Sequence, residues 1–551
     1  MPQVELPPKY YLDHFESLLA FIVSKCSPLL SANEAEFIDC FRALPEDARC
    51  LFVRLLNRKG IYFRANRLSY SEIQTLPNAL ETLINTGFVY LVSEVATPTP
   101  ILNLFTRKEL GQFAHQQQLQ PPPHLKKNEL IIWLASHLNF SDWLAWLNEN
   151  DPVIEHGFKP ETDILRLMFF GSTHHDMTTF VVSDLGHSRF ESFDSSQLTS
   201  AFTERRILEE KYAIVRAGQR FRLLESLIPP TQLVEWFKAW LPTAEQTFEP
   251  TIQNSFDRLV LQVARSLERK NESSMALDIY QKTKSPPSRE RRTRLLHKCG
   301  EDEAALTLCG DILDMPYTPE ERLFAEDFES RLLKRRQKAT TLYLKQAECL
   351  AVEDSAELSI ELCVLKHYLT LGYQGFFSEN NVWRSLLGLL CWPLIFDTSN
   401  GALHHPFQRA PSNWANYLSS REDEVTQQLK LLDERTLFTT YIEAIYAEKY
   451  GTHNPLVVWY EELPAHLLAF YQCMTPVQLK AVLIRIANDP TIYGQGMPDL
   501  FIWREDDEYN FIEVKSPNDS LSAKQLDWLR FFERHDVNAK VIRTQSTSEN
   551  A

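Results

Sequence analysis

The sequence predicts a multidomain, mostly α-helical protein with a smaller α/β domain at its C-terminal end. Its 551 residues are enough for about three or four domains of ordinary size. Only 16 residues are glycine, which favours helices over Gly-rich barrels and propellers. Apolar residues spaced by three and four predominate along the chain, whereas consecutive strand-like segments gather near its C-terminal end.

Composition limits the classes of function. Lys and Arg number 57 against 73 Asp and Glu, a net charge of -16, which is unexpected for a protein that coats nucleic acid uniformly but leaves room for local basic patches. The 9 cysteines include no C-x-x-C pair, so we expect a reducing compartment without disulfides or structural zinc. The longest apolar run, residues 386–396, is too short to cross a bilayer, and the first residues lack a signal-peptide pattern. We therefore expect a soluble intracellular protein with no membrane partner.

Residues 1–100 are predicted to form an N-terminal helical DNA-binding domain. Apolar side chains at positions 48, 51, 52, 55 and 56 have the spacing of an amphipathic helix. Arg54, Arg58 and Lys59 belong to the same segment. A basic face of this kind is equally typical of a solvated helix and of contact with nucleic-acid phosphates. These three residues are therefore candidate DNA-binding residues.

Residues 101–235 are predicted to hold a helix-turn-helix followed by a small mixed α/β region. Two short helices are expected at Thr106–Ala114 and Lys126–Leu134, with a break of three prolines between them. Lys108, Lys126 and Lys127 lie near the helix starts. This arrangement resembles the SAP motif, which binds the DNA backbone, although Gln and the proline triplet replace its glycine and loop positions.

Strands are expected next, at Leu165–Phe170, Thr178–Ser183 and Arg189–Phe193, where apolar residues run together or alternate. A His-His-Asp triplet, residues 174–176, falls between two of them. Neighbouring residues of a strand face opposite sides, so the two histidines could not readily bind one ion. We interpret the triplet as an exposed or structural loop rather than a metal site.

Residues 236–371 contain a faint internal repeat in helical sequence. The segment Lys270–Leu277 recurs 29 residues later as Cys299–Leu306, with Ala276 and Ala305 in equivalent places. Stacked helical hairpins of the TPR type have this pattern when they are divergent.

Two basic clusters fall in or near this repeat, in an otherwise acidic protein. Such concentration favours a track for nucleic acid over a merely solvated face. The first cluster comprises Lys282, Lys284, Arg289, Arg291, Arg292, Arg294 and Lys298, and the second comprises Arg331, Lys334, Arg335, Arg336 and Lys338.

The C-terminal part, residues 372–551, carries the strongest pattern. A glycine turn at residues 494–496 leads to Asp499 and an apolar strand, and a second strand runs from Tyr509 to Lys515. A helix is expected to open near Ser522 and to carry Lys524 and Gln525, before a last strand at residues 539–543.

The spacing of these residues brings charged groups together. Glu513 and Lys515 lie two apart, so they share one face of their strand while Val514 points into the core. A hairpin lays Asp499 beside that face. Two carboxylates and an ammonium group suit a hard cation such as Mg²⁺ or Mn²⁺, with Lys515 orienting water or holding a phosphate. The alternative is a structural Glu–Lys ion pair, which leaves Asp499 and the glycine turn unexplained.

Three C-terminal motifs together resemble the signature of the VRR-NUC branch of the PD-(D/E)xK nucleases: Gly494–Leu500, Glu513–Lys515 and Asn518–Gln525. Far upstream, Leu51–Arg64 resembles the N-terminal helix motif of the Fanconi-associated nuclease family. The SAP-like and TPR-like segments follow in that family's order, so the resemblance covers nearly the full length. It implies a VRR-NUC nuclease domain with a restriction-endonuclease-like (PD-(D/E)xK) α/β core over residues 372–551.

The resemblance also implies roles for individual residues. Glu379 corresponds to an acidic metal ligand on an upstream helix, although from the sequence alone it is only an acidic residue in a first helical turn. Asp499, Glu513 and the Val514 carbonyl correspond to ligands of a first Mn²⁺ or Mg²⁺ ion, and Glu379 to a ligand of a second. Lys515 corresponds to the catalytic lysine, while Lys524 and Gln525 are candidates for DNA contact on the following helix.

The function implied by the resemblance is that of a metal-dependent DNA phosphodiesterase of the phosphodiesterase I type. It would act as a 5′-flap endonuclease and 5′-to-3′ exonuclease on branched DNA, including 5′ flaps and crosslinked forks, during interstrand crosslink repair. We expect a cytoplasmic protein associated with the bacterial nucleoid, a monomer or dimer, without the family's ubiquitin-binding zinc finger.

Two alternatives stay open. A Holliday-junction-type resolvase with the same core would act as a dimer that cuts symmetrically. A helical-repeat scaffold that binds DNA with an inactive nuclease remnant would belong to another class. The catalytic positions Glu379, Asp499, Glu513 and Lys515 all carry the expected residue types, which argues against such a remnant.

Overall fold

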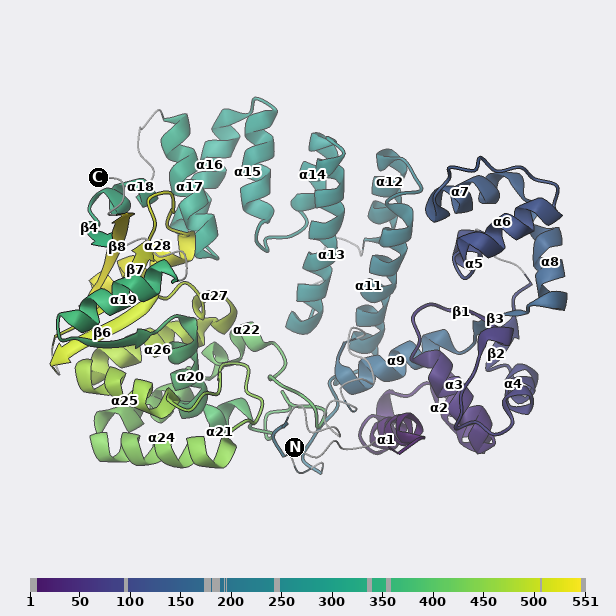
Figure 1. Ribbon diagram of the computed structural model, residues 1–551, viewed down its shortest axis with the longest axis horizontal. Helices are drawn as coiled ribbons and strands as arrows, with labels where there is room; N and C mark the ends of the chain where they lie inside the picture. Colours follow the sequence, from purple (N-terminus) through teal and green to yellow (C-terminus); the bar gives the residue numbers. More distant parts are fainter. Residues whose placement is uncertain are drawn as a thin grey trace. The chain divides into compact units, whose positions relative to one another are not determined.

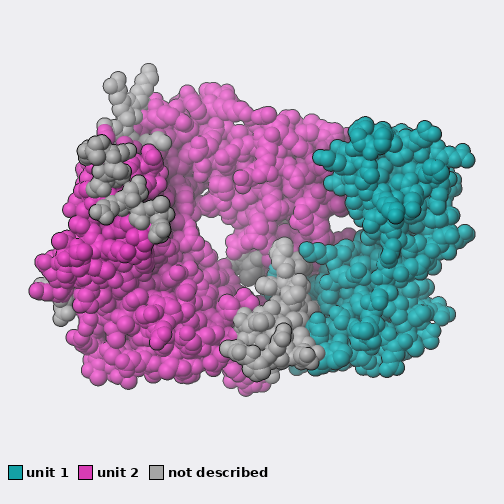
Figure 2. Space-filling view, viewed as in Figure 1, with its two compact units in different colours: residues 1–187, 199–208 teal, residues 188–198, 209–551 magenta. Residues whose placement is uncertain are grey.

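The computed structural model divides the chain into two compact units (Figure 2). Unit 1 comprises residues 1–187 and 199–208, and unit 2 comprises residues 188–198 and 209–551. The structure describes residues 7–93, 98–172, 180, 189–192, 194, 196–241, 248–333, 339–352, 358–505 and 508–546. Most of these residues are helical, as the sequence predicts. Within them, we find no helix with the length and apolar character needed to span a membrane.

Unit 1 combines helices with a small antiparallel sheet. Its first helices are α1 (Tyr10–Lys25), α2 (Ala32–Ala43), α3 (Glu46–Leu56) and α4 (Leu76–Asn85), with short 3₁₀ turns at Ser27–Leu29 and Ala65–Arg67. The strands β1 (Tyr62–Arg64), β2 (Val89–Leu91) and β3 (Val153–His156) pair in the order β1-β3-β2. The N-terminal region is thus mostly helical, as expected. Strands β1 and β2 were not predicted, because they are too short to show a strand period.

The strand expected at Leu165–Phe170 is also wrong. These residues form the second half of α9 (Lys159–Phe170), which has Pro160 in its first turn and ends at Gly171 in a left-handed conformation. Leu165, Leu167, Met168, Phe169 and Phe170 are all buried. An apolar run that is buried on every side looks alike in a helix and a strand. The strand expected at Thr178–Ser183 and the triplet 174–176 lie outside the described residues, Phe180 excepted. Arg189 forms only an isolated bridge with Thr452.

The two short helices predicted around the proline triplet are confirmed. They are α6 (Arg107–Gln116) and α7 (Lys127–His137), and they share an apolar core with α5 (Thr99–Leu102) and α8 (Phe140–Asn150). Thr106 caps α6, because its hydroxyl accepts from the Glu109 amide while the Glu109 carboxylate accepts from the Thr106 amide.

A series of helices follows along the chain (Figure 1). It comprises α11 (Arg205–Leu224), α12 (Pro230–Trp240), α13 (Pro250–Arg269), α14 (Ser273–Tyr280), α15 (Ser288–Lys298), α16 (Asp302–Asp314), α17 (Pro319–Leu332) and α18 (Ala339–Lys345). Ala276 of α14 and Ala305 of α16, which hold equivalent places in the repeat, are both fully buried. Among the described residues of this region, the helical interpretation fails at β4 (Glu348–Val352), which joins a sheet.

The C-terminal sheet has five strands in the order β4-β8-β7-β6-β5. Its other members are β5 (Gln374–Phe377), β6 (Leu500–Glu505), β7 (Glu508–Lys515) and β8 (Ala539–Ser546). β6 and β7 form the predicted antiparallel hairpin, while β8 runs parallel to both β7 and β4. One face of the sheet packs against α19 (Ile360–Thr370) through a core that includes Val364, Leu365 and Ile512.

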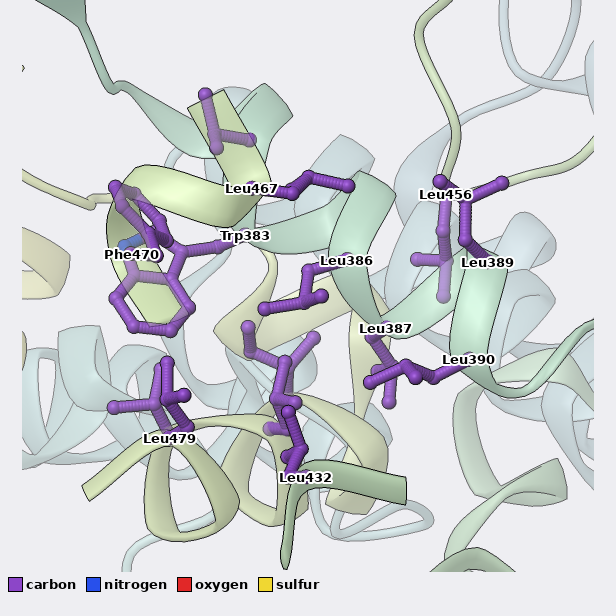
Figure 3. Close-up of a cluster of buried hydrophobic side chains, with 14 of the residues drawn as sticks. Trp383, Leu386, Leu387, Leu389, Leu390, Leu432, Leu456, Leu467, Phe470 and Leu479 are labelled. Atoms are coloured by element: carbon purple, nitrogen blue, oxygen red, sulfur yellow. The ribbon is translucent and has the colours of Figure 1, made fainter. Parts of the chain in front are cut away.

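The opposite face of the sheet holds the main core of unit 2. Figure 3 shows part of it, with Trp383, Leu386 and Leu387 facing Leu432, Phe470 and Leu479. The helices that build it are α20 (Asn380–Leu390), α21 (Trp392–Ile395), α22 (Trp414–Tyr417), α23 (Glu422–Gln428), α24 (Arg435–Lys449), α25 (Leu463–Cys473), α26 (Pro476–Asn488), α27 (Pro490–Tyr493) and α28 (Ala523–Arg534), with 3₁₀ turns at Ser419–Arg421 and Leu429–Asp433.

Candidate active site

The alternation of side chains along β7 produces a charged patch at the end of that strand. Tyr509 and Phe511 face the main core of unit 2, whereas Ile512 and Val514 face α19. Glu513 and Lys515 therefore continue the side of Phe511, but at the edge of the core rather than inside it. The Lys515 Nζ atom lies 2.8 Å from Glu513 Oε1, and the two side chains are 11% and 1% exposed.

Asp499 lies opposite Glu513 at the start of β6. The hairpin pairs Leu500 with Ile512, and the same register continued by one residue brings Asp499 to Glu513. The Val514 amide donates to Asp499 Oδ2 at 2.7 Å, and the Ser378 amide donates to the Asp499 carbonyl at 2.8 Å. Asp499 is thus held by β7, across the predicted hairpin, and by Ser378 directly after β5.

Gln525 connects Glu513 and Lys515. Its Nε2 atom donates to Glu513 Oε1 at 2.5 Å, and its Oε1 atom accepts from Lys515 Nζ at 3.2 Å. Oε1 also accepts from the amide of Ser522, the N-cap of α28. One amide side chain therefore fixes the carboxylate, the ammonium group and the start of the helix together.

The glycine turn before Asp499 is fitted against α28. Gly496 has φ +88°, and a Cβ atom added there would lie 2.5 Å from the Cβ atom of Lys524. Lys524 Nζ donates to Gln495 Oε1 at 2.8 Å, and Trp528 Nε1 donates to the Gln495 carbonyl at 3.0 Å. Glycine is needed here both for its backbone conformation and for the close approach of the helix.

The pKa of both carboxylates is raised above its ordinary value. Burial raises the pKa of Glu513 to about 8, and the charge of Asp499 adds to this although Lys515 opposes it. Burial also raises the pKa of Asp499 to about 6, against the hydrogen bond from Val514 and the charge of Lys515. At neutral pH the pair therefore retains a proton, which a bound cation would displace.

Glu379 lies at the edge of this pair. It is exposed at the N-cap of α20, and its charge contributes to the raised pKa of both Asp499 and Glu513. Across the described part of the chain, however, no three His, Cys, Asp or Glu side chains form a group that could hold a metal ion.

The residues present nevertheless fit a divalent cation. Glu513 Oε2 is buried and accepts no hydrogen bond from any described residue, and an unpaired buried carboxylate oxygen is costly. Mg²⁺ and Mn²⁺ prefer oxygen ligands, and the two facing carboxylates supply them.

The predicted DNA-binding residues of unit 1 have different surroundings. Arg54 is occupied within the protein, since it forms an ion pair with Glu72 and stacks 3.8 Å from the centre of the Tyr11 ring. Arg58 and Lys59 are exposed and line an open hollow of about 620 Å³.

The three candidate lysines near the starts of α6 and α7 also differ: some are exposed, and one is bonded within unit 1. Lys108 of α6 and Lys126 before α7 are exposed. Lys127 donates to the carbonyl of Asn103 at 3.1 Å and is thus partly occupied within unit 1.

Three arginines of the first basic cluster form ion pairs within unit 2. Arg289 is buried with Glu321, and Arg291 and Arg294 pair with Glu268 and Glu290. Lys282, Lys284 and Lys298 are exposed. Of the second cluster only Arg331 lies within the described residues.

Two polar contacts were not found from the sequence. Ser378 Oγ donates to the Pro498 carbonyl at 3.1 Å, and Asn380 Oδ1 accepts from the Met497 amide at 3.1 Å. Both residues are more than a hundred positions from the turn that they hold. Their only sequence signal is a run of polar residues, 378–381, between an apolar strand and an apolar helix.

Comparisons with known proteins agree with this architecture. The family model for the FAN1 HTH domain matches residues 9–90, and the model for the VRR-NUC domain matches residues 435–546. A crystal structure of paFAN1 bound to DNA with a 2-nt 5′ flap and a gap has a TM-score of 0.84 and 28% identity, covering 98% of this chain and 99% of that one.

Similar proteins occur in distant organisms. The Fanconi-associated nuclease 1 homolog of Arabidopsis thaliana is 24% identical over 99% of this chain and 68% of its own length. The homolog of Pseudomonas aeruginosa is 30% identical over 97% of this chain and 95% of its own length. With its sequence and fold in agreement, the chain belongs to the Fanconi-associated nuclease family.

Proposed function

We propose that this protein is a structure-specific DNA nuclease that hydrolyses phosphodiester bonds in branched DNA. It would act as a 5′-flap endonuclease and a 5′-to-3′ exonuclease, with 5′ flaps and crosslinked forks as substrates. The observation that carries the proposal is the buried carboxylate pair Asp499–Glu513, with Lys515 and Gln525 against it and one glutamate oxygen unpaired. That paFAN1 was crystallised with 5′-flap DNA supports the choice of substrate.

Each side chain of the site has a proposed task. Asp499 and Glu513, with the Val514 carbonyl, would hold a divalent cation, and Glu379 would hold a second one. Mg²⁺ or Mn²⁺ bound there supplies charge stabilisation for the phosphate oxygens and lowers the pKa of water. Lys515 donates a hydrogen bond to water or to a phosphate oxygen and balances the charge of Glu513. Gln525 keeps these two side chains in place.

The DNA would be held by its phosphates rather than by its bases. Arg58, Lys59, Lys108 and Lys126 are exposed cations of unit 1, and Lys524 lies beside the glycine turn. Contacts of this kind position a duplex without reading its sequence, so the preference would be for DNA shape. We propose accordingly that residues 107–137 are a SAP-like element, that α13–α17 are TPR-like hairpins, and that the C-terminal sheet is a PD-(D/E)xK core.

The same proposal extends to the biological role. Cutting near the base of a 5′ flap, followed by short 5′-to-3′ steps, is the activity that releases an interstrand crosslink from one strand. We therefore place the protein in DNA repair, acting on the chromosome.

The test is cleavage by the purified full-length chain. Oligonucleotides that form a 5′ flap, a 3′ flap, a nick or a four-way junction would be incubated with Mn²⁺, with Mg²⁺ or with EDTA. We expect metal-dependent cutting of the 5′ flap above the other forms. The variants Asp499→Asn, Glu513→Gln and Lys515→Met should each lose it by at least about a hundredfold, the size expected when a charged group of a metal site is lost.

Glu505→Gln is the matched control. Glu505 is an exposed acid at the far end of the same hairpin, so its loss changes the net charge equally but should leave cleavage intact. Equal cleavage by native protein and Glu513→Gln, at equal purity, would refute the proposal. Symmetric cutting of the four-way junction by a dimer would favour a resolvase instead, and DNA binding without turnover would favour a scaffold.

A further inference from the structure

Arg384 is a partly buried cation for which the described residues provide no acidic partner. It lies in α20, and its Nη2 atom donates to the carbonyl of Pro455 at 2.7 Å. Its Nε atom is buried and has no hydrogen-bond partner, and burial lowers the pKa of its guanidinium group. Arginine stays charged inside proteins, so this charge is left uncompensated at a cost in free energy.

Several other arginines of the same unit are paired with acids: Arg289 with Glu321, Arg421 with Asp397 and Arg485 with Asp527. Arg485 lies against Tyr493 of α27. Arg292 resembles Arg384, since its Nε atom is also buried without a hydrogen-bond partner and burial lowers its pKa. What distinguishes Arg384 is its position beside the turn that leads to Asp499.

The loop beside Arg384 does not depend on it. Asn454 Nδ2 donates to the Gly388 carbonyl at 3.2 Å, and the Val458 amide donates to Ser385 Oγ at 3.0 Å. These two bonds attach residues 454–458 to α20 independently of the guanidinium group. Anchoring that loop is therefore an insufficient reason for a charged side chain at this position.

Arg384 lies beside the segment that carries Asp499. A Cβ atom added to Gly494 would lie 3.4 Å from Arg384 Cδ, and Gly494 opens the turn that leads to Asp499. Asn380, one helical turn earlier on the same side of α20, holds the Met497 amide of that turn. Arg384 and Asn380 thus lie on the side of α20 that contacts the turn leading to Asp499.

We infer that Arg384 is a phosphate-binding residue: it takes a backbone phosphate of the DNA strand next to the bond that is cut. A guanidinium group donates charge-assisted hydrogen bonds to phosphate oxygens, and the phosphate supplies the negative charge that the described residues do not place beside Arg384. This inference rests on the proposed nuclease function and adds a residue for which neither the motifs nor the spacing gave a role.

The experiment replaces single phosphates by neutral methylphosphonates. A 5′-flap substrate would carry one such linkage at a time around the cut, and kcat/KM would be measured for native protein, Arg384→Gln and Arg384→Lys. In native protein one flanking linkage should lower kcat/KM by about 10- to 100-fold, the size of a charged hydrogen-bonded contact. Arg384→Gln should lose a similar factor on unmodified DNA and become insensitive to that linkage alone, with Arg384→Lys between the two.

Controls separate this contact from a structural role. Arg435→Gln removes an exposed arginine at the start of α24 and should keep the native linkage profile. Thermal unfolding of the Arg384 variants should stay close to native. If Arg384→Gln retained full sensitivity at every linkage, or matched native protein on unmodified DNA, the inference would be overturned.

Binding of the same oligonucleotides without divalent ions gives a second reading. Native protein should bind more weakly when the one sensitive phosphate is neutral, and Arg384→Gln should not respond to it. This binding measurement does not need turnover. If native protein did not cleave DNA, the proposed function would be refuted, while the phosphate contact could still be tested by binding.

Discussion

Glu513 is a carboxyl group that the fold buries at a cost. Because its pKa is raised to about 8, the folded protein binds a proton there that the unfolded chain has released above about pH 4.3. The free energy of unfolding must therefore fall as pH rises from about 4.3 to 8. Glu513→Gln abolishes cleavage in our proposal, but it should raise the melting temperature at pH 8 by about 2–4 °C and by less at pH 5.

The measurement is thermal unfolding at the two pH values without divalent ions. Glu505→Gln, at an exposed site, should show no such difference between pH 5 and pH 8. A Glu513→Gln variant that is less stable than native protein at pH 8 would mean that Glu513 serves the fold as an ion-pair partner of Lys515.

Gln525 offers a second prediction at this scale. Gln525→Leu removes the hydrogen bonds to Glu513 and Lys515 but leaves both charged groups in place. Loss of such a supporting contact costs about 10- to 100-fold, and we expect it in kcat rather than in KM. Single-turnover kinetics on a 5′ flap measure both. Gln427→Leu, at an exposed glutamine, should have native values, and an unchanged kcat for Gln525→Leu would contradict the positioning role.

The charged residues of the hairpin could be predicted from the sequence, because local strand periods determine where they lie. Glu513 and Lys515 are two apart on a strand and Asp499 is across a hairpin, so local periods place all three. Arg384 and Asn380 meet the site only through the packing of α20 on a turn more than a hundred residues away. No local period encodes such a contact.

At the scale of elements, the glycine turn and α28 act together. Gly496→Ala must overcome both a positive φ and a clash with Lys524, whereas Gly300→Ala meets only a positive φ of +85°, with open space around it. The conformational cost is about 1–2 kcal/mol for each, and the clash adds about 1–3 kcal/mol at Gly496.

Urea unfolding of the two glycine variants should separate these costs. Gly496→Ala should be the less stable, and it should also lose cleavage because the turn carries Asp499. Similar stability for both variants would mean that α28 can move away from the turn.

Helices and strands with a regular hydrophobic period could be predicted from the sequence. Those whose surroundings depend on contacts with distant segments could not. The hairpin β6–β7 and helix α28 follow from alternation and from the capping pattern at Ser522. The segment Leu165–Phe170 was misread because burial on all sides removes any period. The basic cluster around Arg289 contains a single acid, Glu290, in the sequence, but Glu268 and Glu321 reach it from other helices.

For the whole molecule, the charge distribution makes a prediction about salt. A protein with net charge -16 binds DNA only through the few places where cations are exposed. Arg58→Gln with Lys59→Gln should weaken binding of a 5′ flap, and each lost phosphate contact should reduce the slope of log K against log salt by about 0.9. Fluorescence anisotropy at several salt concentrations measures both quantities.

The control for this pair is Lys430→Gln, an exposed lysine of unit 2, which should keep the native slope. Hydrolysis of a small phosphodiester with Mn²⁺ should be unchanged in the Arg58/Lys59 variant, because the carboxylate site lies wholly in unit 2. An unchanged salt slope would show that the 620 Å³ hollow faces no DNA.

The position of β8 has a consequence for how the protein is made. This strand, residues 539–546, lies between β7 and β4, so the sheet stays open until almost the entire chain has left the ribosome. In a nascent chain the edge of β7 that β8 will cover is therefore still unpaired, so the proposed cleavage site around Glu513 is incomplete. A polypeptide stopped before Ala539 should be harmless to DNA even at high expression, which viability of cells producing it would reveal.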